Sequence, residues 1–433
     1  MNTATTAPID TQDVSPLAHL SAAQLEELGR EFDEIRDRVQ SELGDRDRRY
    51  IESMIEMQRR LAVLGRVGLL LPRFPPLAFG GAAALSAAKI LENMEIGHNV
   101  MHGQWDWMND PRIHSSTWDW DTASTAEAWK HSHNYVHHTF TNIRGKDKDL
   151  GYEIMRIDPH QRWHPVYLLQ PLYNLVLAAL FEWGVALHDL DIEAIRRGEK
   201  SMGQLKHELK GIAGKARDQV VKDYIAWPLV SALASAALGA ALEASKPEPG
   251  RAGLRRRRAR GGRLPRIANR ALADGGRAFR RAAAANAGAN LARNVWAYAI
   301  IFCGHFPDQT YTYSPEEVED ESRGGWYIRQ LTGAANIEGS PLFHVASGNL
   351  GYQVEHHLFP DMPSTRYAEI APQVKEICAR YGLPYNTGPF SQQLGMVQRT
   401  ILRLAFPGGK PRPKPGPYRP ADADEGDDPG HPR

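Results

Sequence analysis

Apolar residues gather in a few stretches along an otherwise polar chain. Residues 61–91 contain two apolar stretches split by three prolines, and each half is shorter than the roughly 20 residues that a membrane-spanning helix needs. They predict a helical hairpin that is partly embedded or is extended by its flanks. Residues 224–242 contain no charged side chain and are the clearest transmembrane candidate, and residues 294–304 end a further one.

The two ends of the chain are polar. Residues 1–20 predict a disordered N-terminus, and its first residues lack the basic start and apolar run of a signal peptide. Residues 21–60 are dense in Leu, Glu, Arg and Met without proline, which predicts a cytosolic helical region at the surface. Residues 403–433 are rich in Pro, Gly and charge and predict a disordered tail.

Residues 251–281 form an anomalous arginine-rich segment between two membrane candidates. It holds twelve arginines and one acidic residue, Asp274. We interpret it as a disordered basic loop that touches anionic lipid, although this placement opposes the positive-inside tendency. The alternative is that GC-rich coding sequence was read here in a shifted frame.

Composition excludes several functional classes. The 52 basic and 51 acidic residues nearly cancel, so no global charge indicates a nucleic-acid partner. Two cysteines cannot form a disulfide framework or a thiolate iron site. The mean hydropathy of -0.46 is low for a polytopic protein, so membrane segments must be located by position along the chain.

Three separated histidine clusters carry the candidate chemistry. GHNVMH places His98 and His102 four residues apart on one face of a helix. HSHNYVHH and QVEHHLFP follow, and the adjacent histidines of the last cluster point in different directions, so one pair can serve two metals. Imidazole suits iron, copper, zinc and nickel, so ligand type alone does not choose the metal. The clusters supply seven imidazoles: His98, His102, His133, His137, His138, His356 and His357.

Residues 167–187 are long enough to span a membrane but carry Gln170, Asn174 and Glu182. If the second and third clusters meet at one site, an even number of crossings must separate them. We therefore expect this segment to lie in the membrane interface, where its polar residues cost less.

The motifs HxxxH, HxxxHH and QxxHH, in this order around membrane segments, resemble the three histidine boxes of membrane fatty acid desaturases. Stretches such as NMEIGHNVMHGQWDWM and SGNLGYQVEHHLFPDMP also resemble actinobacterial acyl-CoA desaturases and, around the third box, front-end desaturases. The resemblance implies an all-α integral membrane protein with about four transmembrane helices, and a cytosolic helical cap holding a di-iron site. The resemblance covers roughly residues 92–402, apart from the arginine-rich segment, and we assign residues 61–402 to the desaturase domain.

The same resemblance implies that the seven box histidines are iron ligands. His305, in CGHFP, is our candidate for a further ligand, and Gln353 occupies the place of a box histidine and would act through a water. The run GKDKDLGY after the second box is expected to be a solvated loop, with contact to the phosphates of an acyl carrier as the alternative. Further candidates that support the ligands or touch substrate are His131, His344 and Asn294.

The implied function is oxygen-dependent desaturation of a long acyl chain, with an acyl-CoA 9-desaturase expected first. A front-end desaturase and an acyl hydroxylase are alternatives on the same scaffold; a soluble zinc hydrolase and a non-catalytic membrane protein are alternatives from other classes. Two irons, O2, an acyl-CoA or acyl-lipid substrate and a lipid membrane are implied. No haem-binding HPGG or nucleotide-binding GxGxxG motif is found, so electrons from NAD(P)H should arrive through a separate reductase or ferredoxin. The expected location is a bacterial plasma membrane, with the site facing the cytoplasm.

Overall fold

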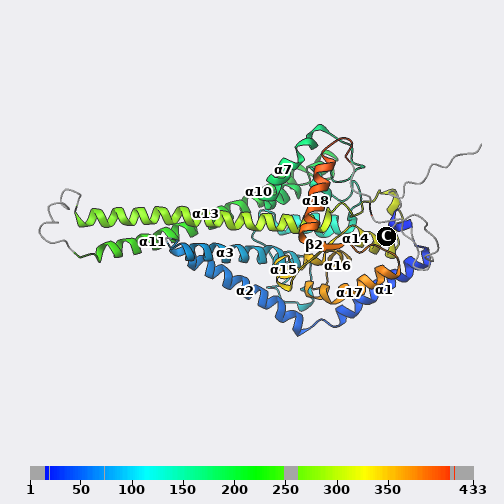
Figure 1. Ribbon diagram of the computed structural model, residues 1–433, viewed down its shortest axis with the longest axis horizontal. Helices are drawn as coiled ribbons and strands as arrows, with labels where there is room; N and C mark the ends of the chain where they lie inside the picture. Colours follow the sequence, from blue (N-terminus) through cyan, green and yellow to red (C-terminus); the bar gives the residue numbers. More distant parts are fainter. Residues whose placement is uncertain (1–14, 19, 73, 248–261, 410–413, 415–433) are drawn as a thin grey trace, which may run out of the picture.

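The computed structural model describes residues 15–18, 20–72, 74–247, 262–409 and 414, which form an almost entirely helical protein (Figure 1). The exception is a pair of three-residue strands, β1 (Asn336–Glu338) and β2 (Thr387–Pro389), which pair in parallel. The predicted all-α fold is confirmed. Most of the two ends predicted to be disordered lies outside the described residues.

The N-terminal helix α1 (Ala22–Ser41) begins at a capping box formed by Ser21 and Gln24, in which each side chain accepts a hydrogen bond from the other residue's backbone N–H. Its buried face packs against α14 (Arg323–Thr332) and α17 (Tyr367–Arg380). The same hydrophobic core includes side chains of α16 (Gln353–Leu358). The N-terminal helix therefore supports the segment that carries the third histidine cluster.

Helices α2 (Asp45–Leu70) and α3 (Pro75–Leu91) form the predicted hairpin, and prolines occupy the first turn of α3. The two helices approach closely at Gly65, where an added Cβ would lie 2.9 Å from the backbone nitrogen of Leu85. Helix α2 begins well before residue 61, so a single helix runs through the boundary predicted between the surface region and the first apolar stretch.

Helices α11 (Trp227–Ala244) and α13 (Arg263–His305) form a second hairpin. Figure 1 shows that it projects in the same direction as α2 and α3 and reaches further. The two hairpins are joined by hydrogen bonds from Ser235 Oγ to the carbonyl oxygen of Leu70 (3.1 Å) and from Arg281 Nη1 to that of Pro72 (2.9 Å). At its other end, α13 delivers His305 to the body of the protein.

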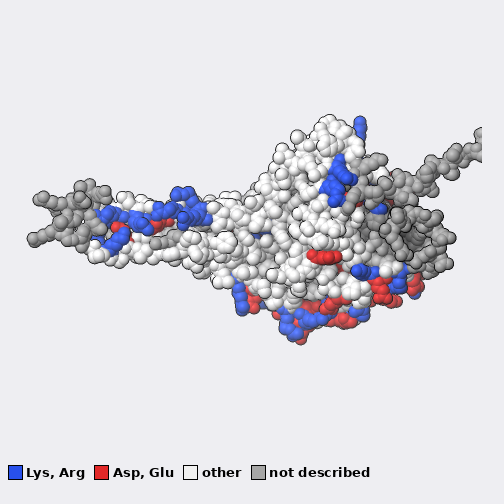
Figure 2. Space-filling model, in the orientation of Figure 1, with Lys and Arg blue, Asp and Glu red and all other residues white. Residues whose placement is uncertain are grey.

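The prediction of a disordered loop is wrong for residues 263–281, which form the first half of α13. Their basic side chains lie along the projecting hairpin (Figure 2), where Arg270 and Arg277 both pair with the buried carboxylate of Asp274. Helical continuity with the apolar half of α13 explains the order, because helix propagation costs little once a helix is nucleated. Residues 251–261 lie outside the described part of the chain.

Among the described residues, one helix is long and apolar enough to cross a membrane. It runs from Met202 to Ala244 through α10 (Met202–Val220), a π-helical turn η8 (Val221–Ala226) and α11, and it contains the predicted span 224–242. Residues 167–187 are instead divided between a 3₁₀ turn η7 (Pro165–Leu169), α7 (Gln170–Ala179) and α8 (Phe181–His188). The break falls at Leu180, whose backbone is not helical.

The remaining elements build the body around the histidine clusters. They are η3 (Glu92–His98), α4 (Asn99–Met101), α5 (Ala126–Trp129), η5 (Lys130–His137), α6 (His138–Phe140), α9 (Ile192–Arg196), α15 (Pro341–Ala346) and α18 (Phe390–Leu404). Six short 3₁₀ turns complete them: η2 (Pro16–Ala18), η4 (Asp106–Met108), η6 (Leu150–Glu153), η9 (Glu316–Val318), η10 (Leu350–Tyr352) and η11 (Ser364–Arg366).

Candidate metal centre

The first two histidine clusters lie on helices that widen into π-helical turns. The turn η3 ends at His98, and η5 carries His133 and His137. A π-helical turn inserts an extra residue into an α-helix and is frequent at functional sites, because it changes the direction of the side chains that follow. His102 follows His98 by one α-helical turn, and the two rings lie 4.6 Å apart, centroid to centroid.

The structure brings eight histidines together, seven of them in two groups and the eighth, His138, between the groups. The first imidazole group consists of His98, His102, His133 and His356; the second consists of His137, His305 and His357. Within each group, the possible ligand atoms all lie within 4.8 Å of one another. His138 lies between the groups, with its ring centroid 4.7 Å from that of His102 and 4.6 Å from that of His357.

Adjacent histidines of the third cluster separate as the sequence predicted. His356 joins the first group and His357 joins the second. The two rings are nearly perpendicular, with an interplanar angle of 87°. One short helix, α16, therefore contributes to both groups.

Many ring nitrogens of these histidines have no hydrogen-bond partner in the protein and are therefore free to bind a metal. Nitrogen atoms that are buried without a hydrogen-bond partner carry a desolvation cost, and a set of them close together fits a bound cation. The unpaired atoms are the Nε2 atoms of His102, His133, His137, His138, His356 and His357, together with Nδ1 of His138 and Nδ1 of His305.

Five of the histidines are held by the surrounding protein through Nδ1. Nδ1 of His137 lies 3.0 Å from a carboxylate oxygen of Asp147, and Nδ1 of His133 lies 3.2 Å from one of Asp149. A carboxylate in this position fixes the tautomer and orientation of a metal-binding imidazole. Neutral partners hold three more: Asn99 for His98, Tyr367 for His356 and Gln330 for His357.

Burial sets the protonation of most of these rings. It lowers the pKa of His98 to about 3 and holds the pKa values of His102, His138, His356 and His357 well below the usual range. These imidazoles are therefore neutral at pH 7, the form that binds metal.

His137 differs in its protonation. Burial opposes its charge, but the carboxylates of Asp147 and Asp149 outweigh burial and raise its pKa to about 9. A cation bound at Nε2 would take the place of the second proton.

The carboxylates of Asp147 and Asp149 were missed as functional residues in the sequence. Their run, GKDKDLGY, was predicted to be a solvated loop, yet both acids turn inward to the second histidine cluster, and Lys148 pairs with Asp191. The available signal was the pair of acids ten to sixteen residues after the histidines that they hold. Asn99, Gln330 and Tyr367 gave no comparable signal.

Gln353 lies inside the centre, with its amide nitrogen 3.1 Å from Nε2 of His305. Gly304 makes this possible, because a Cβ at that position would lie 2.8 Å from the Gln353 side chain. The other candidates lie elsewhere. His131 is exposed and stacks on Tyr135, His344 stacks on Tyr352, and Asn294 donates to the carbonyl oxygen of Ala179.

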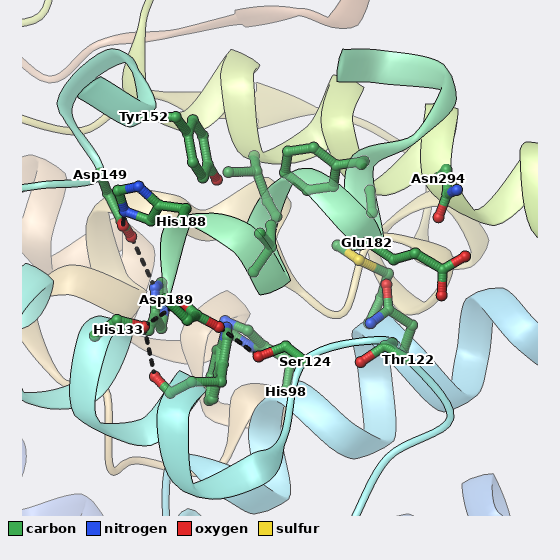
Figure 3. A pocket seen from close by; sticks show the side chains of 18 of the residues that line it. His98, Thr122, Ser124, His133, Asp149, Tyr152, Glu182, His188, Asp189 and Asn294 are labelled. Atoms are coloured by element: carbon green, nitrogen blue, oxygen red, sulfur yellow. Dashed lines mark hydrogen bonds and ion pairs between the residues drawn. The ribbon is translucent and has the colours of Figure 1, made fainter. Parts of the chain in front are cut away.

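A cavity lies beside the two groups and encloses about 880 Å³ of empty space, part of it open to solvent. Figure 3 shows His133, Asp149 and His188 on one side of it and Glu182 and Asn294 on the other. Much of the wall between them is apolar. Its apolar and aromatic lining includes Met94, Trp120, Trp129, Tyr152, Phe181, Val185, Ala297, Ile301, Phe306 and Leu350.

The chain is similar to known fatty acid desaturases. A family model described as fatty acid desaturase matches residues 211–389, which include His305 and the third cluster. The NADPH-dependent stearoyl-CoA 9-desaturase of Mycobacterium tuberculosis is 43% identical over 396 residues, covering 91% of this chain and 83% of that protein.

More distant relatives share parts of the chain. The sn-1 linoleoyl-lipid 6-desaturase of Synechocystis is 24% identical over 333 residues, or 74% of this chain and 78% of that protein. Human fatty acid desaturase 3 is 40% identical over 89 residues, which are 21% of this chain and 20% of that protein. No solved structure matches the chain. The extent of the mycobacterial match establishes that the chain belongs to the fatty acid desaturase family and is an oxidoreductase.

Proposed function

We propose that this desaturase inserts a cis double bond at carbon 9 of a saturated long-chain acyl-CoA. The mycobacterial relative, which is named for this reaction on stearoyl-CoA, is similar over nearly the whole chain. In the overall reaction, one O2, two electrons and two protons remove two hydrogens from adjacent methylenes and leave two waters. The apolar cavity beside the two imidazole groups provides room for a chain of methylenes.

The observation that carries the proposal is the set of buried imidazoles with unpaired Nε2 atoms. We propose that the first group holds one iron and the second group holds another, with His138 between them. Iron bound there would supply the oxygen-derived oxidant that no amino-acid side chain provides. The chain's own residues orient the ligands through Asp147 and Asp149 and exclude water by burial, as precise attack on one carbon pair requires.

The proposed topology has four membrane crossings, made by α2, α3, α11 and α13. Two observations support it: the hairpins project in the same direction (Figure 1), and large apolar side chains are exposed along α2, α3 and α11. An even number of crossings then separates the clusters, and the site lies in a cap on the cytoplasmic face of the plasma membrane. Electrons would come from NADPH through a separate reductase or ferredoxin, in agreement with the name of the mycobacterial relative.

The test is expression in a host without its own desaturase, fed one saturated chain at a time, with mass spectrometry of the double-bond position. The proposal predicts a double bond at carbon 9, and the His137→Ala variant serves as the inactive control. A product made only from chains that already contain a double bond, with the new one nearer the carboxyl end, would identify a front-end enzyme. A hydroxylated chain would identify a hydroxylase.

A further inference from the structure

One wall of the cavity comes from a single face of α13. Asn294, Ala297, Ile301 and His305 line it at helical spacing, so the helix runs beside the cavity from the second imidazole group outward. At 1.5 Å per residue, Ala297 lies about 12 Å and Asn294 about 16 Å along the axis from His305. Positions along α13 therefore mark distances along the cavity from the metal centre.

Polar side chains close the far end of this wall. Glu182 is buried, pairs with Arg293 and accepts a hydrogen bond of 2.8 Å from Gln219. Next to it, Asn294 accepts a hydrogen bond from the Arg293 guanidinium and donates one of 3.0 Å to the carbonyl oxygen of Ala179. We call this the polar end. A methyl group pushed among these residues would break hydrogen bonds that water cannot replace, so the polar end should stop an acyl chain.

The smallest of the side chains with which α13 lines the cavity lies between the polar end and the metal centre. Ala297 is buried and lines the cavity, whereas its neighbour along the same face, Ile301, is branched and larger. A larger side chain at position 297 would fill the space that the last carbons of a chain need. The cavity lining also includes Met94 and Phe181, which share one packed core with Ala297 and leave little room for adjustment.

We infer that Ala297 and the polar end set the length of acyl chain that fits beyond the desaturated carbons. In an extended chain three bonds advance about 3.6 Å, so 12 Å corresponds to about ten bonds and 16 Å to about thirteen. A double bond at carbon 9 of an 18-carbon chain leaves eight bonds beyond carbon 10, which brings the methyl end close to Ala297. The inference rests on the proposed 9-desaturation, and it names a specificity determinant for that reaction.

The experiment compares Ala297→Leu with the unchanged chain on saturated acyl-CoAs of 14, 16, 18 and 20 carbons. The variant should keep activity on 14 carbons and lose at least tenfold on 18 relative to 14. Ala287→Leu, the same substitution at an exposed position of α13, is the matched control and should leave the profile unchanged. Binding is measured in parallel without oxygen or reductant, as thermal stabilisation by each acyl-CoA, and should show the same loss for 18 carbons.

A second variant covers the case in which Ala297→Leu does not accumulate. Ala297→Gly removes a methyl group instead of adding bulk, and it should raise conversion of 20 carbons relative to 18. An unchanged chain-length profile in both variants, or equal loss on every chain with normal iron content, would overturn the inference. If the unchanged chain makes no double bond at carbon 9 from any substrate, the proposed function fails instead.

Discussion

The two imidazole groups differ in how the fold supplies them. The first group takes all four histidines from the three boxes, on segments that belong to the body of the protein. The second group takes two from the boxes and its third, His305, from the end of the long helix α13. The first group therefore depends on the packing of the body, whereas the second also depends on a helix that continues into the projecting hairpin.

The supports of the groups differ as well. Each has one histidine whose Nδ1 faces a carboxylate, Asp149 for the first and Asp147 for the second. An amide side chain holds one ring in each group, Asn99 on His98 and Gln330 on His357. Among the described residues, the second group has a further amide, Gln353, which lies 3.1 Å from Nε2 of His305. Gln353 is therefore an additional support that belongs to the second group.

The largest effect is expected from His356→Ala and His357→Ala, adjacent changes that remove one imidazole from each group. Each variant should lose iron and reduce product formation at least a thousandfold, because a metal ligand acts as part of a unit. Iron content by elemental analysis and product by gas chromatography provide the measurement. Product from either variant at more than a tenth of the parent level would break the assignment of that group.

Asp147→Asn should lower iron affinity and activity by roughly 10- to 100-fold, because it removes the carboxylate that orients His137. Lys148→Gln, in the same loop but paired with Asp191 away from the histidines, is the control and should behave like the parent. Equal effects of the two substitutions would mean that the loop, and not the carboxylate, is what matters.

Gly304→Ala should affect the second group alone. The new methyl would lie 2.8 Å from Gln353, displace it from His305 and reduce activity roughly 10- to 100-fold, as expected for a displacement of about 1 Å at a reacting site. Gly288→Ala, on the same helix with no atom within 4 Å, should be neutral. Spectroscopy of the bound iron should change at one of the two sites; a change at both would contradict the separation of the groups.

The smallest effect concerns Glu95, which is three residues before His98 and supports the first group. Burial raises the pKa of Glu95 to about 8, while its carboxylate binds Tyr50 of α2, Ser364 and Asn349. The folded state thus favours the protonated acid, so the contribution of Glu95 to stability is fully present below pH 4.5 and is lost as the pH rises to about 8. The unfolding temperature of the Glu95→Gln variant should therefore fall less than that of the parent between pH 5 and 8. Identical pH profiles of the two proteins would contradict the role given to burial.

The sequence predicted the helical fold, the first hairpin and the residues of both imidazole groups, because histidine clusters and apolar runs are local signals. His305 was within reach through the family resemblance, which implies a further histidine from the membrane segment before the third box. Asp147 and Asp149 were not, since only the folded loop turns them toward His137 and His133. The prediction of a loop for residues 263–281 was wrong for a related reason, because it used composition alone. Arginine-rich composition indicates a loop, but in the folded chain these residues belong to a helix that packs on α11.

The central claim is that the two imidazole groups hold one iron each. The most direct measurement is the iron content of the purified full chain, determined by elemental analysis together with Mössbauer spectroscopy of protein grown on enriched iron. The account predicts two irons per chain that interact magnetically as a pair. A single iron per chain, or zinc in its place in active protein, would contradict it.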